Sequence, residues 1–436
     1  MVQVVFFIIL CTLAGYFCFK GYRRVVKNIQ LGRDENLTDH PAQRLRNMTL
    51  VALGQKKMFK NVTPAVLHLF LYVGFVITQI ELIEIFIDGL TGHHRIIYHA
   101  VEHINVLRSF YVFVISFIEA ISILVFVGTV CFLARRWVLR VPRLNMPELK
   151  GWPIKDATII LLAEIFLLMC IFSMNTADMA MHHGEYGFLV SGWLMPLFNG
   201  WSYTHTHVIE RLGWWGHLSC VLGFLVYLPY SKHLHILLAF PNTYYSRLQP
   251  KGYIANMPEI TKEIKLMMNP EAAPAATDAN PAPIKFGAKD VADLSWKNLM
   301  DAYSCTECGR CTAACPANIT GKKLSPRKIM MDTRDRLEEV GRSIEANNGE
   351  WKEDGKSLIE HGYISVEELR ACTTCNACVE ECPVMISPLD IIIQLRRNLV
   401  MEESNAPAEW TGMFTNMENN GAPWQFSQQD RLKWND

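Results

Sequence analysis

Five long apolar segments constrain this 436-residue chain more than any other feature of its sequence. Each is long enough to cross the apolar core of a lipid bilayer as a helix. The first runs into the basic stretch Lys20–Arg24, which indicates a retained span rather than a cleaved signal peptide. The predicted spans are Val2–Phe19, Thr63–Ile87, Phe110–Ala134, Ala157–Thr176 and Trp214–Phe240.

The basic residues of the loops between these segments predict their orientation. Residues 20–61 and 135–155 hold ten and six Lys or Arg side chains, whereas residues 89–108 and 181–212 hold two and one. Loops rich in Lys and Arg stay on the cytoplasmic side of a membrane. We therefore expect the N-terminus outside and everything after the fifth span inside the cell. The formal net charge is zero and the cations sit beside the spans, so no nucleic-acid partner is expected.

A duplicated cysteine motif is the most specific feature of the second half of the chain. Eight of the 13 cysteines form two copies of the pattern C-x2-C-x2-C-x3-C-P. Three thiolates at this spacing can bind one cubane, and the fourth cysteine of each copy binds the other cluster. Zinc ribbons use paired C-x2-C motifs instead of triplets, which disfavours zinc. The motif predicts two [4Fe–4S] clusters, the first on Cys305, Cys308, Cys311 and Cys382, and the second on Cys372, Cys375, Cys378 and Cys315.

The 56 residues between the two motifs carry signals for helices. Helix N-termini are predicted at Ser325-Pro326, at Ser365 with Glu368, and at Ser387-Pro388. A compact βαββαβ ferredoxin has no room for such an insert. We therefore expect an α-helical ferredoxin domain that holds both clusters.

A tract rich in Ala and Pro separates the two halves of the chain and is typical of a semi-extended tether. The predicted domains are a five-span membrane domain over residues 1–240, an amphiphilic segment and linker over 241–284, the ferredoxin domain over 285–404, and a C-terminal tail over 405–436. The expected fold class is all-α, with a five-helix transmembrane bundle followed by a cytoplasmic α-helical ferredoxin domain.

Histidines are concentrated in the membrane half, where twelve of the 14 lie between His68 and His235. His217 and His235 bracket the fifth predicted span. Their separation of 18 residues is five helical turns, or about 27 Å of rise, so both rings are expected on one face, near opposite sides of the bilayer. His68 would enter the second span at the level of His235, and two facing imidazoles suit a six-coordinate haem b. A place at the membrane interface is the alternative for each histidine taken singly.

The outer side of the bundle offers a partner for His217. His103, or His99 one turn before it, could pair with His217 and hold a second haem b, so the sequence predicts one haem or two. The alternative for His99 and His103 is a solvated polar loop.

Two acidic side chains, Glu81 and Glu84, lie three residues apart in the second predicted span. Acidic residues inside a span are costly and mostly functional. A quinone exchanges protons when it is oxidised or reduced, so we expect Glu81 and Glu84 to transfer protons at an outer quinone pocket. The alternative, above all for Glu84, is an ion pair with Arg95 or Arg108.

With these residues placed, the membrane half resembles the haem b gamma subunit of respiratory nitrate reductase. That family has five spans, an outer N-terminus, bis-histidine haems between the second and fifth spans, and a quinol site near the outer haem. His217 and His235 match its fifth-span pair, and His68 matches the inner ligand of its second span. Where the family has a further histidine in the second span, this chain has apolar residues, Thr78 and Gln79.

The ferredoxin domain is similar to those in the iron–sulfur subunits of fumarate reductase and anaerobic glycerol-3-phosphate dehydrogenase. The whole chain resembles membrane iron–sulfur quinone oxidoreductases, such as heterodisulfide-reductase-like complexes and electron-transfer-flavoprotein:menaquinone oxidoreductases. The resemblance implies a multi-pass protein of a bacterial or archaeal inner membrane that passes electrons between a cytoplasmic partner and the quinone pool, with menaquinone as the expected quinone.

Those relatives also carry cysteine-rich CCG domains, which this sequence lacks. We therefore expect a separate CCG-domain iron–sulfur subunit docked on residues 285–436, which would face an electron-transfer flavoprotein or another flavoprotein and would lead to the substrate chemistry. The alternatives are a membrane iron–sulfur redox sensor and a subunit of a ferredoxin-linked ion pump.

Overall fold

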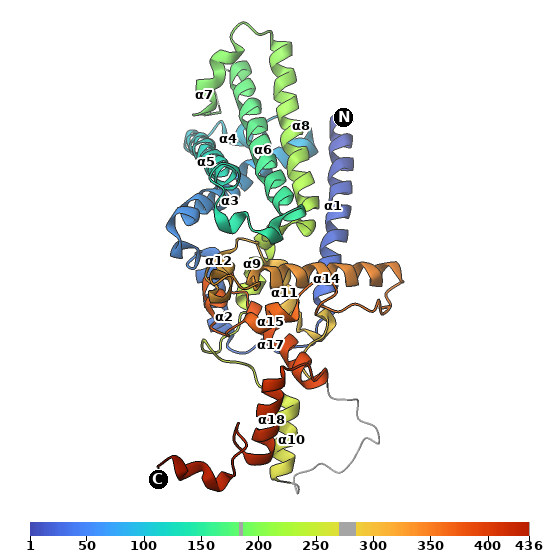
Figure 1. Cartoon of the computed structure of the whole chain (residues 1–436). Helices are drawn as coiled ribbons and strands as arrows, with labels where there is room; N and C mark the ends of the chain where they lie inside the picture. Colours follow the sequence, from blue (N-terminus) through green and yellow to red (C-terminus); the bar gives the residue numbers. More distant parts are fainter. Residues whose placement is uncertain (183–185, 270–284, 436) are drawn as a thin grey trace.

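The computed structural model describes residues 1–182, 186–269 and 285–435. The described residues form helices and two isolated β-bridges, with no strand among them. The predicted all-α fold class is therefore confirmed. The chain forms a bundle of long helices with a helical domain stacked against one of its ends (Figure 1). We call that end of the bundle proximal and the opposite end distal. The predicted tether over residues 270–284 lies outside the described residues.

Five helices of the described chain are long and apolar enough to cross a membrane, as predicted. They are α1 (Val2–Ile29), α3 (Val62–Thr91), α5 (Asn105–Trp137), α6 (Trp152–His182) and α8 (Tyr203–Tyr227). Many of their large apolar side chains, such as Phe113 and Phe117, are exposed in the isolated chain. Contact with lipid would bury them, so the bundle is that of a membrane protein.

The fifth span departs from its predicted form. α8 ends at Tyr227, and Pro229 follows directly in a 3₁₀ turn. Proline lacks an N–H group and its ring clashes with the preceding turn, which kinks or breaks a helix. Only after a second 3₁₀ turn does α9 (His235–Tyr244) begin. The expectation that His217 and His235 project from one face of a continuous helix was wrong, and the proline was the signal for the break.

The C-terminal domain consists of short helices around one long helix. Its helices are α11 (Trp296–Ser304), α12 (Arg310–Ala313), α13 (Pro316–Ile319), α14 (Pro326–Ala346), α15 (Val366–Ala371), α16 (Ala377–Glu381) and α17 (Pro388–Arg397). Three of them begin where predicted, because the side chains of Ser325, Ser365 and Ser387 accept hydrogen bonds from the first turns of α14, α15 and α17. The equivalent helices α12 and α16 of the two cysteine motifs pack together. Outside this domain lie α2 (Pro41–Met48), α4 (Ile96–Val101), α7 (Ser191–Leu194), α10 (Pro258–Met268) and α18 (Ala408–Asn420).

The bundle and the C-terminal domain share an apolar core. Val25 of α1 and Leu234 are buried together with residues of the C-terminal domain. α1 extends past the proximal end to α14 (Figure 1). There Asn28 lies against Gly341 and donates a hydrogen bond to the Tyr303 hydroxyl at 2.8 Å. The two halves of the chain therefore pack against each other.

Candidate functional site

A cavity beside α12 and α16 collects cysteines from both motifs. The cysteines that line it are Cys305, Cys308, Cys311, Cys378 and Cys382. Cys315, the fourth cysteine of the first motif, lies instead near Cys372 and Cys378, where their charges would interact. The structure thus brings Cys382 to the first motif and Cys315 to the second, which is the exchange that the spacing predicts.

The two cysteine loops repeat one backbone conformation. Glu307 and Thr374, which precede the second cysteine of each motif, both have φ of 55°. Gly309 and Asn376, which follow it, have φ of 72° and 61°. Residues other than glycine rarely adopt positive φ, and the repeat lets backbone N–H groups approach the sulfur atoms. The N–H of Thr374 donates to Cys372 Sγ at 3.4 Å, an arrangement that stabilises an anionic cluster.

The cysteine side chains fit an iron–sulfur cluster. All 13 cysteines of the chain are free thiols. Burial raises the pKa of Cys305 to about 12, so its thiol would not ionise at neutral pH by itself. Iron binding replaces the thiol proton and offsets the buried negative charge.

The first cysteine loop is fastened to the proximal end of the bundle. Arg310 donates to the carbonyl oxygen of Lys57 at 3.3 Å. Glu307 accepts hydrogen bonds from Lys232 Nζ at 2.6 Å and from Arg334 at 2.7 Å. Burial opposes the ionisation of Glu307, but Arg334 and Lys232 outweigh it and lower its pKa to about 2. The buried carboxylate therefore stays charged and links the loop to the membrane domain.

Two of the predicted haem ligands meet at the proximal end. The rings of His68 and His235 have centroids 6.5 Å apart and planes at 43°. His68 Nδ1 lies 3.1 Å from Gln55 Oε1, and His235 Nδ1 lies 3.0 Å from the Lys232 carbonyl oxygen. These oxygens only accept, so both Nδ1 atoms carry the proton and both Nε2 atoms keep a lone pair. With metal–imidazole bonds of about 2 Å, the spacing is compatible with one metal ion bound by both rings.

Lys232 connects the histidine pair with the first cysteine loop. Its backbone carbonyl orients His235, and its side chain bonds to Glu307. Sequence reasoning did not find Lys232, Glu307 or Gln55, because no motif marks contacts between segments so far apart in the chain. The arrangement places a potential metal-binding pair of imidazoles directly beside the first cysteine loop.

The remaining histidine candidates do not come together. His217 is buried in α8, and its Nδ1 has no hydrogen-bond partner among the described residues. The His99 side chain is half exposed and pairs with Glu102 at 3.2 Å, while the His103 side chain is 86% exposed. Neither contacts His217 in the described part of the chain. A bis-histidine haem at the level of His217 therefore does not fit the described residues.

Glu81 and Glu84 are buried at the distal end, in a network around Arg95. Arg95 Nη1 lies 3.1 Å from Glu84 Oε2 and 3.4 Å from Glu81 Oε1. The Tyr111 hydroxyl donates to Glu84 at 2.6 Å, and the Asn175 amide donates to Glu81 at 3.4 Å. The structure thus shows the ion pair that was the alternative for Glu84. The assignment of Glu81 and Glu84 to a quinone pocket stays a prediction.

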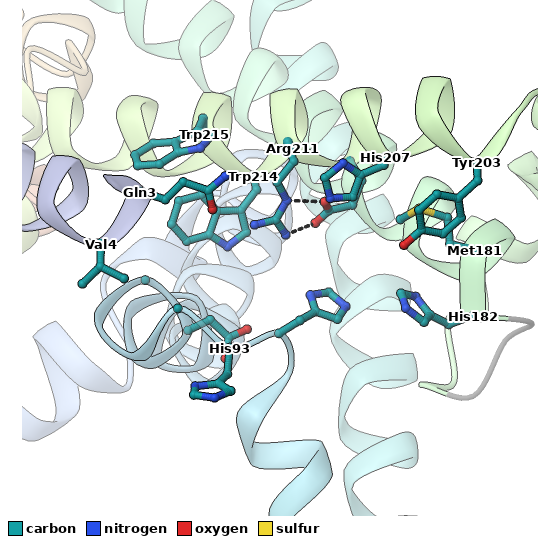
Figure 2. Close-up of a pocket in the computed structure, with 15 residues that line it drawn as sticks. Gln3, Val4, His93, Met181, His182, Tyr203, His207, Arg211, Trp214 and Trp215 are labelled. Atoms are coloured by element: carbon teal, nitrogen blue, oxygen red, sulfur yellow. Dashed lines mark hydrogen bonds and ion pairs between the residues drawn. The ribbon is translucent and has the colours of Figure 1, made fainter. Parts of the chain in front are cut away.

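A cavity of about 270 Å³ opens at the distal end, beside the ends of α1, α3, α6 and α8 (Figure 2). Figure 2 shows His182 of α6 and His207 and Tyr203 of α8 directed into it. Glu210, paired with Arg211, lies in its wall. Glu81, Glu84 and His217 do not line this cavity.

Comparison with known proteins agrees with the cysteine motifs. Residues 304–386 match the 4Fe-4S dicluster domain family. The chain is 27% identical over 464 residues to a probable iron-sulfur-binding oxidoreductase, FadF, of Bacillus subtilis, which covers 99% of this chain and 60% of that protein. It is 27% identical over 421 residues to the EtfAB:quinone oxidoreductase of Syntrophomonas wolfei, which covers 91% of this chain and 54% of that protein.

A shorter match, 34% identical over 173 residues, joins 36% of this chain to 25% of a probable membrane-anchored ferredoxin of Chromohalobacter salexigens. The chain spans little more than half the length of the two relatives that it matches nearly end to end. No solved structure matches the chain. By its dicluster domain and these relatives, the chain is similar to iron–sulfur oxidoreductases and to a membrane-anchored ferredoxin, and it has an electron-transfer role.

Proposed function

We propose that this protein passes electrons between a cytoplasmic redox partner and the membrane quinone pool. The observation that supports it most is the connection between the first cysteine loop and the pair of His68 and His235. The side chain of Lys232 bonds to Glu307 of the loop, and its backbone carbonyl bonds to His235. Arg310 of the same loop interacts electrostatically with His68. Iron–sulfur clusters and haem b bound at these places would supply one-electron transfer.

The ligands of the proposed cofactors follow from the grouping of side chains. Cys305, Cys308, Cys311 and Cys382 would hold the first [4Fe–4S] cluster, and Cys372, Cys375, Cys378 and Cys315 the second. His68 and His235 would hold one haem b. We propose no haem at His217, because no described histidine faces it. The expectation of an outer quinone pocket depended on a haem at the level of His217. Without that haem, we propose no position for the quinone. Menaquinone is favoured by the resemblance.

The two cysteine loops differ in exposure, and the difference favours one side for the partner. Gly309 and Arg310 of the first loop are buried, whereas Thr373 and Cys375 of the second are exposed. We propose that the partner docks over the second loop. The name of the Syntrophomonas wolfei relative, EtfAB:quinone oxidoreductase, supports an electron-transfer flavoprotein as a partner. The resemblance favours a CCG-domain iron–sulfur subunit between that flavoprotein and this chain. The basic loops support a cytoplasmic C-terminal domain and an outer N-terminus.

The test uses the full chain, purified without oxygen and placed in lipid nanodiscs. We expect about eight cluster irons per chain, a haem b spectrum, and reduction of the haem by a soluble menaquinol analogue. His235→Ala should remove the haem band. His99→Ala, which changes an exposed histidine, should leave it. A preparation without haem, or a haem that does not respond to the quinol, would contradict the proposal.

A further inference from the structure

Three possible metal ligands lie together at the distal end. His94 Nε2 and His182 Nδ1 lie 2.9 and 2.8 Å from the same oxygen, Asp178 Oδ1. The three donor atoms lie within 4.8 Å of one another, and the two imidazole rings are stacked with centroids 5.3 Å apart. Asp178 and His182 stand four residues apart on α6. This spacing puts two side chains on one face of a helix and recurs in helical metal sites.

A further hydrogen bond orients the Asp178 carboxylate. Its second oxygen, Oδ2, accepts from Arg95 Nε at 3.3 Å, and Arg95 Nη2 in turn donates to Asn175 Oδ1 at 2.9 Å. Oδ1 is thereby held toward the two rings. Metal-binding carboxylates are commonly fixed in this way by a hydrogen bond to the oxygen that does not bind the ion.

The charges around Arg95 favour an additional cation. Its guanidinium contacts the carboxylates of Glu81, Glu84 and Asp178, and each of these four side chains is at most 4% exposed. Three buried carboxyl groups thus share one guanidinium. A cation bound by Asp178 would bring a second positive charge to this group.

The site is open to the distal cavity. The side chains of His94 and His182 are 31% and 34% exposed, and both line the cavity. Polar side chains of Tyr203 and His207 face the same space (Figure 2). A hydrated ion can therefore reach the three ligands and keep a bound water on the open side.

We propose that His94, Asp178 and His182 form a binding site for a divalent cation of the zinc class. Zn²⁺ binds two imidazoles and one carboxylate with a water in the fourth position. The ion would hold the segment after α3 against the end of α6. The inference goes beyond the electron-transfer role and needs neither haem nor quinone.

The test measures zinc binding to the full chain with its clusters intact, in nanodiscs. The protein is dialysed against Zn²⁺, and bound metal is counted by mass spectrometry. The variants are His94→Gln and His182→Gln. The matched control is the double variant His99→Gln/His103→Gln, which changes two exposed histidines in the same part of the bundle. Cluster absorbance reports whether each variant is folded.

We expect one zinc per chain in the unaltered protein and in the control, and at least about 10-fold weaker binding in each site variant. Absence of bound zinc in the unaltered protein, or equal binding in the site variants, overturns the proposal. If the site variants do not fold, X-ray absorption at the zinc edge decides on the unaltered protein. Two imidazoles and an oxygen ligand support the site, and sulfur ligands overturn it.

Discussion

Single hydrogen bonds orient the proximal histidines. Gln55 Oε1 and the Lys232 carbonyl oxygen each accept a hydrogen bond from one Nδ1 atom, so the proposed metal-binding atoms of His68 and His235 are their Nε2 atoms. Gln55 has φ of 50°, a conformation that is uncommon for a residue with a side chain. Residues kept in such conformations are often found at functional sites. At the residue scale, the backbone of Gln55 is thus held in an uncommon conformation where its side chain contacts His68.

The first prediction concerns Gln55→Leu. The variant should keep the haem but raise its midpoint potential, because a hydrogen bond to Nδ1 makes an imidazole a stronger donor and favours the oxidised iron. Spectroscopic redox titration measures the shift. Gln79→Leu in α3, the helix that carries His68, is the control. Within the described part of the chain, the Gln79 side chain bonds only to the carbonyl of Phe75, so the potential should be unchanged. Equal potentials for both variants would show that Gln55 does not orient an iron ligand.

The second prediction concerns Arg95→Met. Removal of this guanidinium leaves buried carboxylates without their counter-charge, and breaking a buried pair in this way costs about 3–5 kcal/mol. Thermal denaturation in detergent should show a clear loss of stability. Arg108→Met changes an exposed arginine and should stay within about 0.5 kcal/mol of the parent protein. Similar melting of the two variants would mean that the carboxyls around Arg95 are neutral.

At the scale of elements, close packing between helices joins the membrane bundle to the cluster domain. A Cβ atom added to Gly341 of α14 would lie 2.2 Å from Asn28 Oδ1 of α1. A Cβ atom added to Gly21 of α1 would lie 2.9 Å from Pro229 Cγ. α1 therefore contacts both the break after α8 and the long helix of the cluster domain. A substitution that moves α1 should therefore disturb both the segment after α8 and α14.

The third prediction tests this packing with two glycines inside helices. Gly341→Ala should destabilise the junction by about 1–3 kcal/mol, because the added methyl group meets a side chain with little room to move. Gly412→Ala in α18 meets nothing within 4 Å and should stabilise its helix by up to about 1 kcal/mol. Limited proteolysis of the full chain, followed at cleavage sites in α14 and in α18, measures both effects. Equal resistance of the two variants would contradict the tight contact.

Local signals in the sequence predicted the helices. Contacts between segments far apart in the chain could not be predicted in this way. Ser325 and Ser365 begin helices as predicted, because a cap and the turn it caps are adjacent in the chain. The length and apolarity of the spans likewise need no tertiary information. The break at Pro229 was a local signal that the apolar pattern concealed. Lys232 acquires its role from Glu307, 75 positions away, so no local pattern could reveal it. Arg95 was named as a possible partner of Glu84, but its bonds to Asn175 and Asp178, 80 and 83 positions away, were not predicted.

For the whole molecule, the two cysteine loops differ in how far they are exposed. The first loop is buried against the proximal end, and Lys232 bonds both to its Glu307 and to His235. The second loop exposes Cys375. Electrons from a soluble partner should therefore enter through the second cluster, whereas electrons from a quinone should reach the haem without either cluster.

The fourth prediction separates these two routes with Cys375→Ala. The variant should lose about four irons per chain, because a cubane cluster lacks one of its four ligands, while the haem stays in place. Haem reduction by a soluble low-potential donor should slow by more than about 10-fold. Reduction by a menaquinol analogue should keep the parent rate, since it bypasses the lost cluster. Cys131→Ala, which removes a thiol from α5 outside both motifs, is the control and should change neither rate.

Unchanged reduction by the soluble donor in Cys375→Ala would show that the partner delivers electrons to the first cluster. A loss of both rates would show instead that the second cluster supports the fold of the proximal site.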